Sequence, residues 1–165
     1  MKTGITLILI AVLILGIGGF IFYINKSGTV NGIVVGDTAI DIKFTTLNGT
    51  IFNLSDHRGK IVVIDFVTTS CSICVEEFKV LKQIASEGRI TLVSINLDGT
   101  TTSDLQKFGN YYELTWIIGN SQKAGIDYQV SGVPTMLVID REGVIRYRGY
   151  YTSLEQLDRV ISQFM

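Results

Sequence analysis

Two cysteines, Cys71 and Cys74, are the residues of this chain whose type and spacing could do chemistry. They follow a run of β-forming residues, 61–67, and a short polar linker, 68–70, and they open an amphipathic segment with helical spacing. The pair therefore falls where a strand gives way to the first turn of a helix. Unpaired backbone N–H groups and the positive end of the helix dipole favour a thiolate there. We expect Cys71 to be the more acidic and nucleophilic thiol, with Cys74 one turn further along and within disulfide reach.

One carboxylate, Asp65, interrupts the apolar strand that leads to the cysteines. An unpaired carboxylate is costly to bury, and functional sites are where such a cost is tolerated. Two interpretations stay open at this point. Either Asp65 is buried and serves the cysteines, which we favour, or it lies at a strand edge and contacts water.

Composition excludes several classes of protein. The chain has 165 residues, enough for one ordinary globular domain, and its net charge of −1 gives no bulk attraction to nucleic acid. Two cysteines three positions apart cannot staple a small disulfide-rich fold. A structural zinc site would need four ligands, and only His57 could join the two cysteines as a Cys or His ligand.

The N-terminus predicts a membrane anchor. Residues 4–24 carry no charge, and a helix of this length spans about 30 Å, the thickness of a bilayer core. A cleaved secretory signal is the alternative, but its apolar region is typically about 7–15 residues long. We therefore expect an anchor over residues 1–26, a glycine-rich linker over 27–36 and a folded domain over 37–165. The flanking charges do not determine the orientation in the membrane.

The rest of the sequence predicts alternating strands and helices. Asn48-Gly49 between apolar runs indicates a β-hairpin, and residues 90–97 predict a second buried strand. Ser153 with Gln156 predicts a capping box for the last helix. The other expected elements are a helix capped by Thr102 or Ser103 and ending near residue 112, a strand over 115–118, a helix over 121–128 and a hairpin of 135–140 with 144–150. This pattern is an α/β domain with a mixed sheet and helices on both faces.

These residues together resemble the thioredoxin fold, and most closely the membrane-anchored TlpA/ResA-like thiol–disulfide oxidoreductases. The resemblance covers residues 36–164. It rests on Gly36 to Ala39 with Asp41, on Gly59-Lys60 before the strand, on Cys71-Ser72-Ile73-Cys74, on Val133-Pro134-Thr135 and on Asp140 to Gly143. It implies a thioredoxin-like α/β fold with a central mixed sheet flanked by helices, an extra N-terminal β-hairpin, and one preceding transmembrane helix.

The resemblance also implies roles for particular residues. Cys71 and Cys74 would be the redox pair, and Asp65 would relay a proton to or from Cys74. Val133 and Pro134 would form a cis-proline loop whose backbone pairs with an extended substrate. Glu77 matches an acidic position in the ResA-like branch, where it would tune the thiols or contact substrate; a solvated glutamate on the helix face is the alternative.

The sequence departs from the family pattern around the cysteines. Ser70 stands where these families usually carry a tryptophan, no proline separates the two cysteines, and Lys79 occupies the usual position of a proline in the helix. These positions bear on the redox potential and on the surface offered to partners, so the direction of electron flow stays open.

The expected function is therefore dithiol–disulfide exchange. The resemblance implies exported thiol proteins, such as apocytochrome c, as substrates, and reduction is favoured over oxidation. No dissociable cofactor or metal is expected, and the partners would be protein thiols or disulfides and a redox partner that recycles the pair. The domain would face outward from a single-pass anchor. The alternatives are a membrane-tethered copper chaperone and a peroxiredoxin-type peroxidase, for which Thr68 stands three positions before Cys71.

Overall fold

A computed structural model describes residues 31–165 of the protein, which form one compact unit. The predicted membrane helix at 4–24 and the first part of the predicted linker lie outside the described residues. Within residues 31–165, no helix has both the length and the apolar character needed to cross a bilayer. Residues 31–36 of the predicted linker are hydrogen-bonded to the domain, since Asn31 pairs with Thr38 and the Gly36 amide donates to the Ile145 carbonyl.

Strands and helices alternate along the chain as the sequence predicts. The strands are β1 (Asn31–Gly32), β2 (Thr38–Ala39), β3 (Lys43–Thr45), β4 (Ile51–Asn53), β5 (Val62–Val67), β6 (Thr91–Asn96), β7 (Ile117–Asn120), β8 (Thr135–Ile139) and β9 (Ile145–Gly149). The helices are η1 (Leu54–His57), α2 (Ser72–Ser86), α3 (Thr102–Tyr111), α4 (Gln122–Asp127) and α5 (Leu154–Ser162).

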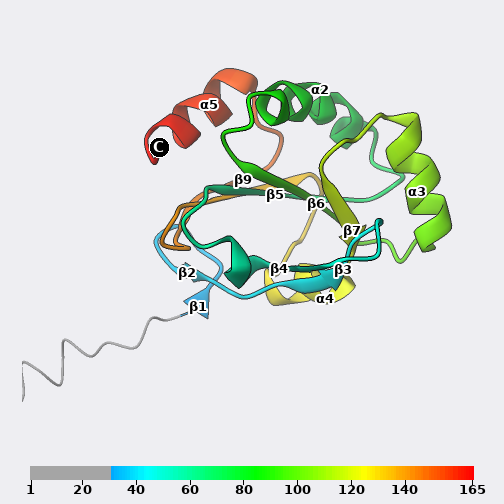
Figure 1. Ribbon diagram of the computed structural model, residues 1–165, viewed down its shortest axis with the longest axis horizontal. Coiled ribbons are helices and arrows are strands. Elements are labelled where there is room, and N and C mark those ends of the chain that lie inside the picture. The colour runs from blue at the N-terminus through cyan, green and yellow to red at the C-terminus, as the bar shows by residue number, and fades with distance from the viewer. Residues whose placement is uncertain (1–30) are drawn as a thin grey trace, which may run out of the picture. The chain divides into compact units, whose positions relative to one another are not determined.

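A five-stranded mixed sheet in the order β7-β6-β5-β8-β9 forms the centre of the domain. Strands β5, β6 and β7 are parallel, whereas β8 and β9 run antiparallel to β5 and to each other. Helices α2 and α5 cover one face, and α4 with the β3–β4 hairpin covers the other (Figure 1). The central mixed sheet with flanking helices is confirmed, and β3 and β4 form the expected extra N-terminal hairpin.

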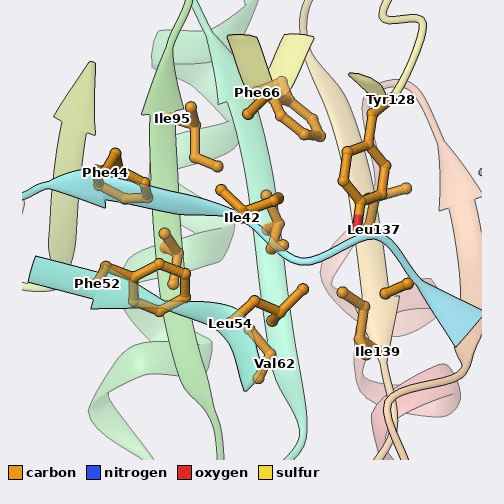
Figure 2. Close-up of a cluster of buried hydrophobic side chains, with 14 of the residues drawn as sticks. Ile42, Phe44, Phe52, Leu54, Val62, Phe66, Ile95, Tyr128, Leu137 and Ile139 are labelled. Atoms are coloured by element: carbon orange, nitrogen blue, oxygen red, sulfur yellow. The ribbon is translucent and has the colours of Figure 1, made fainter. Parts of the chain in front are cut away.

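The central strand β5 is buried along its whole length and supplies both hydrophobic cores. Val62, Ile64 and Phe66 point to one side, where Figure 2 shows Phe44 and Phe52 of the hairpin meeting the sheet. Val63 and Val67, which alternate with these residues along the strand, join the other core, beneath α2 and α5. This alternation follows from the two-residue period of a strand, and it puts Asp65 on the α2 side of the sheet.

Segments that precede β5 cover both edges of the sheet. At the β9 edge, the amide of Ala39 donates to the Gly143 carbonyl, and the Ile145 amide donates to the Asp37 carbonyl. At the β7 edge, the Leu47 amide donates to the Ile118 carbonyl. Unpaired strand edges invite aggregation, so this N-terminal stretch both closes the core and protects the sheet.

Several element boundaries differ from the sequence-based prediction. Helix α3 is capped by Thr101, one residue before the earlier of the two expected caps, because the Thr101 hydroxyl accepts from the Asp104 amide. Strand β7 runs two residues later than expected, because Gly119 and Asn120 pair with β6 instead of forming a turn. The Ser153 cap is confirmed, but the Gln156 side chain donates to the Tyr147 hydroxyl, so only half of the capping box is seen.

The close packing around Gly119 predicts that a side chain at this position lowers the stability of the fold. A Cβ at this position would lie 2.5 Å from the Phe44 ring and 2.7 Å from the Thr45 carbonyl oxygen. We expect Gly119→Ala to lower the free energy of unfolding by roughly 1–3 kcal/mol, measured by denaturant titration.

Gly109→Ala is the matched control. Its Cβ would make ordinary contacts of 3.6 Å with Ile118 and 3.7 Å with Leu47, and alanine favours the helix by about 1 kcal/mol. Equal losses in the two variants would contradict the close-approach explanation.

Candidate active site

Cys71 and Cys74 occupy the junction between β5 and α2. Cys71 is the N-cap of α2, with extended backbone angles, and its sulfur accepts a hydrogen bond from the Cys74 amide at 3.1 Å. The two sulfurs are joined in a disulfide, with the Cα atoms 5.3 Å apart. Cys71 is partly exposed, whereas Cys74 is completely buried. The predicted helix-start position and disulfide reach are both seen, and only one of the two sulfurs is open to a partner.

A carboxylate on the neighbouring strand fixes the loop that presents Cys71. Asp98, just beyond β6, accepts hydrogen bonds from the Thr69 amide at 2.8 Å and from the Thr69 hydroxyl at 2.6 Å. Its other oxygen accepts from Asn96 and Thr100. Burial tends to raise the pKa of Asp98, but these hydrogen bonds outweigh burial and hold the pKa well below its usual range. Asp98 was not predicted from the sequence as a functional residue, although Asp98-Gly99 directly follows the predicted strand at 90–97.

Asp65 is fully buried on the central strand. Its Oδ2 accepts a hydrogen bond of 3.3 Å from the Ser94 hydroxyl, and its Oδ1 has no partner among the described residues. Burial raises the pKa of Asp65 well above its usual range, the charge of Glu77 raises it further, and the Ser94 hydrogen bond opposes the rise. The strand-edge interpretation is wrong, because β5 pairs with β6 on one side and β8 on the other.

Glu77, one turn after Cys74, is also fully buried. Its Oε1 accepts from the Thr152 amide at 2.8 Å, and its Oε2 has no partner within the described part of the chain. Burial raises the pKa of Glu77 from 4.5 to about 7, against the opposing effect of the Thr152 hydrogen bond. The interpretation as a solvated helix-face glutamate is wrong, since the connection between β9 and α5 hydrogen-bonds to it.

The Val133–Pro134 peptide bond is cis, and it immediately precedes β8. The Thr135 hydroxyl donates to the Gly132 carbonyl at 2.6 Å and closes this loop. Because Phe66 pairs with Thr135, continuing the register places Pro134 opposite Val67, at the end of β5 from which the cysteine loop departs. Val133 and Cys71 pack against the same hydrophobic core. The two loops thus leave the same end of the sheet.

His57 lies away from the cysteines. It ends η1, before β5 begins, whereas Cys71 follows the opposite end of β5. Its ring is partly buried and stacks on Phe52 with centroids 4.9 Å apart. Among residues 31–165, no group of three or more His, Cys, Asp or Glu side chains is placed to hold a metal ion.

Three further residues complete the environment of the buried carboxyls. Ser94 and Thr152 hydrogen-bond to Asp65 and Glu77, and the indole of Trp116 donates to the Ser94 hydroxyl at 2.8 Å. None of the three was predicted from the sequence to have a role. A serine within an apolar predicted strand was the one available signal, at Ser94.

A mixed sheet whose central strand leads into a Cys-x-x-Cys helix start, with a cis-proline loop at the same end, defines a thioredoxin-like site for thiol–disulfide chemistry. The AhpC/TSA family model matches residues 35–148, and the chain belongs to this family.

Relatives and solved structures agree with this class. The chain is 29% identical over 143 residues to the thioredoxin-like protein YneN of Bacillus subtilis, covering 84% of each chain. It is 29% identical over 151 residues to the thiol-disulfide oxidoreductase ResA of Geobacillus kaustophilus, covering 88% of this chain and 83% of that one. A crystal structure from Chlorobium tepidum named after the thiol:disulfide interchange protein DsbE superposes with a TM-score of 0.72 and 25% identity, over 80% of this chain and 98% of that one. The protein is a thioredoxin-like thiol–disulfide oxidoreductase, as the sequence resemblance indicated.

The raised pKa of Glu77 predicts how stability depends on pH. Between the ordinary value of 4.5 and about 7, the folded state holds a proton that the unfolded state releases, so stability falls as pH rises through this window. From about pH 5 to about pH 8, we expect the disulfide form to lose on the order of 2 kcal/mol through Glu77.

Glu77→Gln supplies the control, because glutamine keeps an acceptor for the Thr152 amide and carries no titrating proton. Denaturant titrations of both proteins across this pH range should show a smaller loss in the variant. The loss that remains would come from Asp65, whose pKa is also raised. Identical pH dependence in the two proteins would contradict the titration of Glu77.

Proposed function

We propose that this protein is a membrane-anchored enzyme that reduces disulfides in exported thiol proteins through Cys71 and Cys74. One observation carries the proposal: Cys71 is partly exposed at a helix start and is bonded to a sulfur, that of Cys74, which no partner protein can reach. Such a pair has one sulfur for attack and one for resolution.

The reaction proceeds in two exchanges. The Cys71 thiolate attacks one sulfur of a substrate disulfide, so that a Cys71–substrate bond forms, the substrate disulfide breaks, and the first substrate thiolate leaves. Cys74 then loses its proton and attacks the sulfur of Cys71, and the second substrate thiolate leaves. The substrate gains two electrons and two protons, and the protein is left with the Cys71–Cys74 disulfide. A dithiol partner restores the reduced pair.

Asp65 accepts the proton that Cys74 loses in the second exchange. It lies on the α2 side of the central strand, buried like Cys74, and α2 brings the charge of Glu77 to bear on it. The structure contains the disulfide, which is the state reached after that proton transfer. A carboxyl with a raised pKa in this state is suited to hold the proton until the pair is reduced again.

Reduction is supported by the charges near the pair. The segment 68–75 contains no Lys, Arg or His, which would stabilise a thiolate, whereas two carboxyls are buried beneath it. A dithiol is strongly oxidising when its reduced form is stabilised, and carboxyls act against that. The cis-proline loop, with Val133 and Pro134, would bind an extended segment of the substrate through its backbone.

The two alternative functions find less support. A copper site would require a histidine near the cysteines, and His57 lies beyond the opposite end of β5. A peroxidase is less supported, because the relatives reported above are named as a thioredoxin-like protein and a thiol-disulfide oxidoreductase.

Substitution of each cysteine tests the assigned roles. We expect Cys71→Ala to lower turnover of a protein disulfide on the order of a thousandfold or more, because the attacking sulfur is lost. Cys74→Ala should instead accumulate a mixed disulfide between Cys71 and substrate, visible by mass spectrometry and released by dithiothreitol. Full multi-turnover activity of Cys74→Ala would contradict the resolving role.

Labelling of intact cells tests location and direction together. The apolar segment 4–24 supports an anchor that holds the domain outside the cytoplasm. If the domain faces outward and acts as a reductant, a membrane-impermeant maleimide should label Cys71 directly, because the pair is kept reduced.

Two other outcomes would revise this proposal. Labelling only after mild reduction of the cells would indicate an oxidant. Labelling only after cell lysis would place the domain in the cytoplasm. The Cys71→Ser variant gives the background level of labelling, because its remaining cysteine, Cys74, is buried.

A further inference from the structure

A chain of two hydrogen bonds links the only tryptophan of the sequence to the buried Asp65. The Trp116 indole N–H donates to the Ser94 hydroxyl at 2.8 Å, and that hydroxyl donates to Asp65 Oδ2 at 3.3 Å. Ser94 is completely buried, and β5 and β6 pair Asp65 directly with it. Sheet register therefore fixes the second bond.

These two hydrogen bonds both donate towards Asp65. An indole N–H donates and cannot accept, so Trp116 fills one acceptor position of the Ser94 oxygen. The single hydroxyl proton of Ser94 remains free to point at Asp65. Hydrogen bonds in series also polarise one another, so the Trp116 bond strengthens the bond that Ser94 donates. Both effects favour the ionised form of Asp65, which is the form that can take a proton.

We propose that Trp116 is a positioning residue for the thiol chemistry: it orients the Ser94 hydroxyl towards Asp65 and so sets how readily Asp65 takes the proton of Cys74. This inference rests on the proposed function. A simpler role for Trp116 would be packing, because its ring lies edge-on to Phe78 with centroids 6.3 Å apart. The two roles predict different pH profiles.

Other titratable groups lie near this face of β5, and their effects on pH dependence must be distinguished from those of the Trp116–Ser94–Asp65 hydrogen bonds. Helix α2 supplies Glu77 and the disulfide-bonded Cys74, and β9 supplies Tyr147, whose hydroxyl interacts with Thr152. His57 lines the same surface cavity of about 470 Å³ as Trp116, and burial lowers its pKa. A pH effect on the indole could therefore originate from His57, so His57→Gln is the matched control.

A single-turnover experiment separates the two exchanges. The reduced full-length protein is mixed with 5,5′-dithiobis(2-nitrobenzoate), which stands for a substrate disulfide. Attack by Cys71 releases one coloured thiolate, and attack by Cys74 on the resulting adduct releases the second. The rate of each phase is measured against pH in the wild type, Trp116→Phe, Ser94→Ala and the double variant.

Ser94→Ala should raise the apparent pKa of the second phase by about one pH unit, the value of a hydrogen bond to a charged group. Trp116→Phe should shift it in the same direction by a smaller amount, and the double variant should match Ser94→Ala, because Trp116 acts through Ser94. The profile of the first phase should not change in any variant, and neither profile should change in His57→Gln.

Tryptophan emission gives a second readout, independent of catalysis. Emission of Trp116 in the oxidised protein should change with pH in the wild type and in His57→Gln, and the change should be lost in Ser94→Ala. An unchanged second phase in both Ser94→Ala and Trp116→Phe, despite normal wild-type exchange, would overturn the role of Trp116 and leave the proposed function intact. A wild type that releases no second thiolate would overturn the proposed function and this role with it.

Discussion

The hydrogen bond from the Cys74 amide to the Cys71 sulfur is the interaction on which the chemistry of this protein depends. It exists because β5 ends and α2 begins within four residues, so that an unpaired amide of the first helical turn meets the side chain of the N-cap. An N-cap is usually an oxygen acceptor; here a sulfur takes that position. The same bond that completes the helix therefore stabilises negative charge on the attacking atom.

The carboxyls behind the pair impose the main energetic cost of the site. Asp65 and Glu77 each have one hydrogen-bonded oxygen and one without a partner in the described residues. Ionisation of both groups in one core is unfavourable, because each negative charge raises the energy of the other. The burial that makes them expensive also retains a proton near Cys74. Stability and reactivity are thus linked through the protonation of the same two groups.

The sequence predicts what is local and misses what is set by pairing across the sheet. The strand, the helix start and the cysteine spacing are local, and so is the turn at Asn48-Gly49; each was expected and is seen. Thr69, the cysteine-loop residue that bonds Asp98, and Ser94, the partner of Asp65, each lie 29 residues from the carboxylate along the chain. No local pattern determines which residue of β6 stands opposite Asp65, so Ser94 could not be assigned a role. The cis bond at Pro134 was expected from the family resemblance alone, since cis is the minor form by default.

Sheet register connects these observations. Because side chains alternate along a strand, a slip of β5 by one residue would turn Asp65 towards the apolar core of Phe44 and Phe52. Such a slip would leave a carboxylate among aromatic rings. Loss of the Ser94 hydrogen bond to the buried carboxylate opposes it, and the segments that cover the β7 and β9 edges hold the remaining strands in place. The N-terminal hairpin contributes no group to the cysteine pair, yet its packing helps to keep Asp65 on the face where Cys74 lies.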